Sequence, residues 1–87
     1  MRREEIYDQA LDLYGITMQM VVCFEEFAEL QKELTKAFRG QKHLANIAEE
    51  IADCEIMIEQ MKRFFGCENS VEKWKRDKLE RLEKRLF

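Results

Sequence analysis

The sequence predicts an all-α protein whose helices form an antiparallel four-helix bundle. Apolar residues recur at spacings of three and four along the whole chain, and no run alternates as a strand would. The chain contains no proline, and its three glycines divide it into four segments. Because the connections are short, consecutive helices are expected to pack antiparallel. The 87 residues suffice for one small domain, so residues 1–87 are predicted to form a single unit.

The first two helices are predicted on either side of Gly15. The first runs from about Arg3 to Tyr14, where the apolar residues fall at helical spacing. The second runs from about Thr17 to Arg39, and Thr17 is a suitable N-cap residue because its hydroxyl can accept a backbone N–H. Gly40 then provides a turn signal.

The third helix is predicted from about Lys42 to Phe65, with Gly66 as the residue that ends it. The fourth is expected to begin after "ENS", where Asn69 followed by Glu72 resembles a capping box and Ser70 is an alternative cap. Its apolar residues form one stripe: Val71, Trp74, Leu79, Leu82 and Leu86.

The third segment is apolar around most of its circumference. Ile47, Ile51 and Ile58 lie on one side, whereas Ala52 and Ile56 lie on the other. A helix that is apolar all round is a buried helix, and a chain of this size has a thin core. We therefore expect a second copy of the chain to cover what one copy cannot, giving a homo-oligomer, either a dimer or a tetramer.

Composition excludes several classes of function. The net charge of −3 argues against nucleic acid as the main partner, and no apolar run approaches the ~20 residues of a membrane span. The polar start "MRREEIYDQ" does not resemble a signal peptide, so a soluble cytoplasmic protein is expected. The cysteines Cys23, Cys54 and Cys67 lack CxxC spacing and are expected to be free, as small hydrophobic residues.

Two acid pairs interrupt the most apolar helices. Glu26 and Glu29 are three residues apart in the second segment, and Glu50 and Asp53 are three apart in the third. In a hairpin centred between Arg39 and Gly40, Glu26 faces Asp53 and Glu29 faces Glu50. On a helical wheel, neighbouring apolar residues lie within ~60° of both Glu26 and Glu50.

Four converging carboxylates repel one another unless cations lie among them or some are protonated. A single ExxE is common on a solvated helix face, but two in register across a hairpin favour a metal site. A di-iron bundle would need two Glu-x-x-His motifs, and the chain has one histidine, His43. Oxygen ligands without nitrogen or sulfur suit Mg²⁺, or Mn²⁺, rather than zinc.

At these residues the sequence resembles the MazG-like all-α nucleoside triphosphate pyrophosphohydrolases. The resemblance lies in ExxE on one helix followed by ExxD on the next, here "EEFAEL" and "EEIADCEIMIEQ". The entry "YGITMQMVVCFEEFAEL" and the tail "KWKRDKLERLEKRL" resemble the small phage and bacterial members, so the similarity covers nearly the whole chain. Cys54 and Glu55 depart from it, since many relatives have apolar residues there.

The resemblance implies a hydrolase that oligomerises through helix pairs and cleaves a nucleoside triphosphate to the monophosphate and pyrophosphate with Mg²⁺. Its metal ligands would be Glu26, Glu29, Glu50 and Asp53. Hydrolysis at the α-phosphorus needs an activated water, which Glu29 or Glu25 could position.

Further side chains are candidates for contact with the triphosphate and the base. The predicted substrate-binding residues are Gln19, Asn46, Lys75, Lys78 and Arg81. Solvated ion pairing is the competing interpretation for the three cations. Trp74 could stack on a base but is expected in the core, and Met18, Met20, Met57 and Met61 are also expected as core residues. The alternative function is a non-catalytic helical module that oligomerises or binds nucleotide without cleaving it.

Overall fold

The computed structural model describes residues 1–87 and consists of four helices without strands. The helices are α1 (Arg3–Tyr14), α2 (Ile16–Phe38), α3 (Leu44–Phe65) and α4 (Glu68–Leu86). The all-α class and the division at the three glycines are thereby confirmed. None of the helices combines the length and the apolar character that crossing a bilayer requires.

Two predicted N-caps are wrong. Thr17 lies inside α2, because Gly15 with a φ of 82° turns the chain from α1 directly into α2 and leaves no segment for a polar cap. The fourth helix begins at Glu68, before Asn69 and Ser70, and no side chain caps it. Gly66 ends α3 in the left-handed conformation, as predicted, and this tight exit lets α4 start at once.

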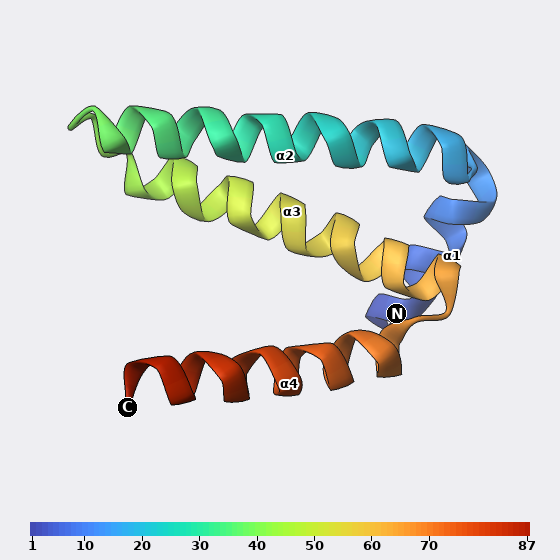
Figure 1. Cartoon of the computed structure of the whole chain (residues 1–87). Helices are drawn as coiled ribbons and strands as arrows, with labels where there is room; N and C mark the ends of the chain where they lie inside the picture. Colours follow the sequence, from blue (N-terminus) through green and yellow to red (C-terminus); the bar gives the residue numbers. More distant parts are fainter.

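The centre of the molecule is the antiparallel hairpin of α2 and α3 (Figure 1). Gly40 adopts a φ of 92° in the turn between them, which few residues other than glycine tolerate. Two contacts fix the register of the hairpin. The amide of Gln19 donates to Gln60 at 2.7 Å, and the thiol of Cys54 donates to the backbone carbonyl of Glu26 at 3.3 Å.

Helix α1 packs at the end of the hairpin away from the turn. Its Tyr7 is buried, and the phenol donates a hydrogen bond to Glu59 of α3. One turn further along α3, Arg63 binds Asp8 with two hydrogen bonds of 2.6 and 2.7 Å. These polar contacts hold α1 against α3.

The core of a single chain is thin, and α4 contributes nothing to it. Only seven residues are buried, among them Cys23, Cys54 and Met57, in agreement with the expectations for these side chains. Met18 and Trp74, however, are 55% and 56% exposed, so their placement in the core was wrong. The reason for Trp74 is that α4 contacts α3 but not α1 or α2 (Figure 1). The predicted bundle arrangement is not confirmed within one chain.

Candidate metal centre

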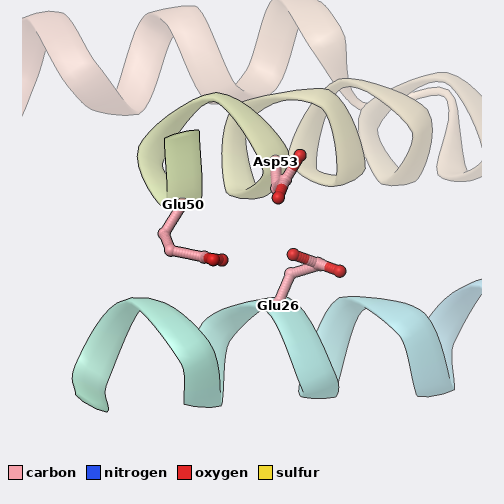
Figure 2. A group of neighbouring side chains, drawn as sticks. All are labelled: Glu26, Glu50 and Asp53. Atoms are coloured by element: carbon pink, nitrogen blue, oxygen red, sulfur yellow. The ribbon is translucent and has the colours of Figure 1, made fainter. Parts of the chain in front are cut away.

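Three carboxylates converge between α2 and α3. Glu26 projects from α2 toward Glu50 and Asp53 of α3 (Figure 2). One oxygen from each can be chosen so that all three lie within 4.8 Å of one another. The register of the hairpin causes this, because Glu26 and Asp53 are equally far from the turn. Glu50 precedes Asp53 by about one helical turn on the same face of α3. We call these three residues the acid triad.

The acid triad is only partly solvated, and its charges are not compensated. All three side chains are half-buried, and the Oε2 atom of Glu50 is buried without a hydrogen-bond partner. Desolvation, and then the charge of Asp53, raise the pKa of Glu26 above its ordinary value. The same two causes, in the same order, raise the pKa of Glu50. The ionised triad is therefore under mutual repulsion that a bound cation would relieve.

The donor set fits a hard divalent cation. The triad offers carboxylate oxygens only, which is the ligand type that Mg²⁺ and Mn²⁺ prefer. Octahedral Mg²⁺ holds oxygens at about 2.0–2.1 Å, so its ligand oxygens lie about 3–4 Å apart. A spacing within 4.8 Å needs only a small side-chain movement to reach that geometry.

Of the two acids predicted to position water, Glu29 lies nearer the triad than Glu25. Glu29 is exposed and stands outside the 4.8 Å group, yet its negative charge contributes to the raised pKa of both Glu26 and Glu50. Glu25 is exposed and contributes to neither shift. The structure thus brings together three of the four predicted ligands and leaves the fourth, Glu29, at their edge.

A fifth acid near the triad was missed in the sequence. Glu33 is only 8% exposed, its Oε2 atom is buried without a partner, and its charge contributes to the raised pKa of Glu50. Its position could have indicated this, since it follows Glu26 and Glu29 at helical spacing on the face of α2 that meets α3.

The predicted nucleotide contacts on the hairpin have different surroundings. Gln19 is 6% exposed, and its amide donates a hydrogen bond to Gln60. Within one chain it therefore joins α2 to α3 and does not face a ligand. Asn46 is exposed at the start of α3, one turn before Glu50, where it can reach a molecule bound at the triad.

The predicted cations on α4 lie away from the triad of their own chain. All three side chains are exposed, and α3 separates α4 from α2 (Figure 1). Lys75 pairs with Glu72 at 3.4 Å, and the ammonium of Lys78 lies 5.9 Å from the centre of the Trp74 ring. Arg81 forms no ion pair. The structure does not bring these cations to the acids within one copy.

No family model, curated protein or solved structure matches this chain. The resemblance to MazG-like enzymes therefore rests on the sequence motif.

Proposed function

We propose that the chain is a MazG-like pyrophosphohydrolase that converts a nucleoside or deoxynucleoside triphosphate to the monophosphate and pyrophosphate with Mg²⁺ or Mn²⁺. The observation that carries the proposal is the acid triad, in which oxygens of Glu26, Glu50 and Asp53 lie within 4.8 Å. Carboxylates are repelled by a triphosphate, so an all-acid site beside such a substrate makes chemical sense only with divalent cations.

In this proposal the triad holds the metal and orients the substrate. A bound divalent ion would neutralise triphosphate charge and acidify a coordinated water. The water oxygen forms a bond to the α-phosphorus, the bond from that phosphorus to the α–β bridging oxygen breaks, and pyrophosphate leaves with that oxygen. Glu29 would accept the proton of the water, because it is exposed at the edge of the triad and its charge acts on both Glu26 and Glu50.

We also infer that the working form is a homo-oligomer. The chain exposes 7205 Å², whereas a compact monomer of its mass exposes about 5,400 Å². Its radius of gyration is 15.7 Å, against about 12 Å for a compact chain of 87 residues. The excess of roughly 1,800 Å² is more than twice the ~800 Å² that each partner buries in a standard interface. A second copy would supply the missing core and complete the helical bundle.

The apolar side of the hairpin is the surface that a second copy would cover. On α2, Phe27 and Leu34 lie ~80–100° from Glu26 on a helical wheel, and on α3, Ile51 and Ile58 lie ~80–100° from Glu50 in the same rotational sense. Because the two helices run antiparallel, both sets fall on one side of the hairpin. These four side chains are 40–49% exposed, and Phe27 and Leu34 line a groove of about 470 Å³ on α2.

In an oligomer, cations of one copy can serve the triad of another. Lys75, Lys78 and Arg81 are on α4, which contacts only α3 of its own chain and carries an exposed apolar stripe. Docking of that stripe on a neighbouring hairpin would carry these cations toward the neighbour's acids and the bound triphosphate.

The decisive experiment identifies the bond that is cleaved. A panel of nucleoside and deoxynucleoside triphosphates is incubated with Mg²⁺ in ¹⁸O-labelled water. The expected products are monophosphate and pyrophosphate, with the label in the monophosphate. Diphosphate plus orthophosphate, or label found only in pyrophosphate, would contradict attack at the α-phosphorus.

The exposed apolar surface favours one other candidate, a helical module that oligomerises without catalysis. It predicts assembly and no turnover of any triphosphate in the panel. Turnover that is lost in Glu50→Gln, while assembly is retained, would exclude this alternative.

A further inference from the structure

Gln19 and Gln60 form a buried hydrogen bond that the proposed reaction does not use. Gln19 of α2 is 6% exposed and Gln60 of α3 is 5% exposed, and the side-chain amide of Gln19 donates to the side-chain oxygen of Gln60 at 2.7 Å. These two amides stand among only seven buried residues. Replacing both partners of a buried hydrogen bond by apolar groups of the same shape is often neutral or stabilising. The stability of the fold alone therefore does not explain why this pair is polar.

The glutamine pair lies two helical turns from the acid triad, on the side away from the hairpin turn. Gln19 precedes Glu26 by seven residues on α2. Gln60 follows Asp53 by seven residues on α3, and this separation is about 10 Å along each helix. Gln19 thus faces Gln60 in the same register that makes Glu26 face Asp53. Any slip of one helix along the other that breaks one of these pairings also breaks the other.

The acids oppose this register as long as no cation lies between them. Their oxygens are brought within 4.8 Å, so the ionised carboxylates repel one another. A slip of α3 by about four residues would place Glu26 opposite Met57 and would separate it from Asp53. Inner side chains would still meet inner side chains after such a slip, because these positions recur with the helical period. A contact that is specific for one register is therefore needed to resist the repulsion.

We propose that Gln19 and Gln60 are positioning residues, whose hydrogen bond holds α2 and α3 in the register that assembles the acid triad before a cation binds. A slipped register would leave both buried amides without their partner, which is costly. The inference rests on the proposed function, because it concerns the same metal centre. The turn is the competing explanation for the register, since Gly40 has a φ of 92° there. The turn lies about 20 Å from Glu26, however, whereas the glutamine pair joins the two helices on the other side of the triad.

The test compares the wild type with the double variant Gln19→Leu, Gln60→Leu. Mn²⁺ affinity is measured by electron paramagnetic resonance, and the register is followed by the ¹⁵N NMR spectrum with and without Mg²⁺. We expect the double variant to bind Mn²⁺ about tenfold more weakly, as it would if about one chain in ten had the register of the triad. Its amide resonances in α2 and α3 should split or broaden, and Mg²⁺ should merge them into one set. The matched control is Tyr7→Phe, which removes a buried side-chain hydrogen bond to α3 without touching α2, and which should keep the wild-type affinity and a single set of resonances.

The outcomes separate this inference from the proposed function. Unchanged Mn²⁺ affinity in the double variant, or a single set of resonances without Mg²⁺, would overturn the positioning role and leave the triad standing. An equal loss of affinity in Tyr7→Phe would also overturn it, because the loss would then follow from lower stability alone. No Mn²⁺ binding by the wild type would refute the proposed function itself. If the double variant did not fold, Gln60→Met, which removes the acceptor at nearly the same volume, would be judged by the same two measurements.

Discussion

Placing a charge on the apolar side of the hairpin should dissociate the oligomer. The chosen change is Phe27→Asp, because Phe27 lines the groove on α2 and is 44% exposed in one chain. An aromatic side chain buries about 150–250 Å² in full, so roughly 90 Å² of Phe27 remains for an interface to cover. At about 25 cal/mol per Å² this is worth roughly 2 kcal/mol.

A symmetric dimer contains the side chain twice, so Phe27→Asp should lower the free energy of association by about 4 kcal/mol. This raises the dissociation constant close to a thousandfold. Desolvation of the introduced aspartate adds to it. The assay is sedimentation velocity with light scattering at micromolar concentration. We expect a dimer or tetramer for the wild type and a monomer for Phe27→Asp.

The matched control is Ala28→Asp, the same charge at the next residue of α2. Ala28 is exposed and does not line the groove, so this variant should assemble normally. Unchanged assembly of Phe27→Asp would refute the assignment of the interface. A wild-type chain that is monomeric at micromolar concentration and fully active would refute the oligomer altogether.

Three further outcomes are expected. Glu50→Gln should abolish turnover and the rise in melting temperature that Mg²⁺ causes, while the helical content stays intact. Glu25→Gln is the control and should behave as wild type. Wild-type turnover in Glu50→Gln would contradict the metal centre. Gln19→Leu should lower the free energy of unfolding by about 1–3 kcal/mol in urea titrations, because it leaves the buried side-chain carbonyl of Gln60 without its donor. Replacing both Gln19 and Gln60 by leucine should recover much of that loss. An unchanged free energy of unfolding in Gln19→Leu would argue against this register contact. Burial and then the hydrogen bond to Glu59 raise the pKa of Tyr7 to about 12, so absorbance at 295 nm should show a late phase that Tyr7→Phe lacks. Because the unfolded chain releases this proton near pH 10, stability should fall from about pH 10 to 12 in the wild type by more than in Tyr7→Phe.

The helices and the pairing of α2 with α3 could be read from local signals. Apolar spacing marks a helix wherever it occurs, and Gly40 and Gly66 have the positive φ that ends one. The equal distances of Glu26 and Asp53 from the turn then predict that they face each other, as they do in Figure 2. The polar caps failed because Gly15 and Gly66 join helices so tightly that no capping segment remains.

The sequence by itself determined four helices, one hairpin register and the acids that this register brings together, because helical period and turn position are properties of neighbouring residues. Only the tertiary structure decided that Glu29 stays exposed while Glu33 is buried, and that Trp74 lies outside any core of its own chain. Apolar residues on one helix face recur with the same helical period whether solvent, another helix or another copy of the chain covers that face. The spacing therefore does not indicate what covers it. What covers it depends on where α1 and α4 pack, and in so small a chain that packing leaves most of the apolar surface open.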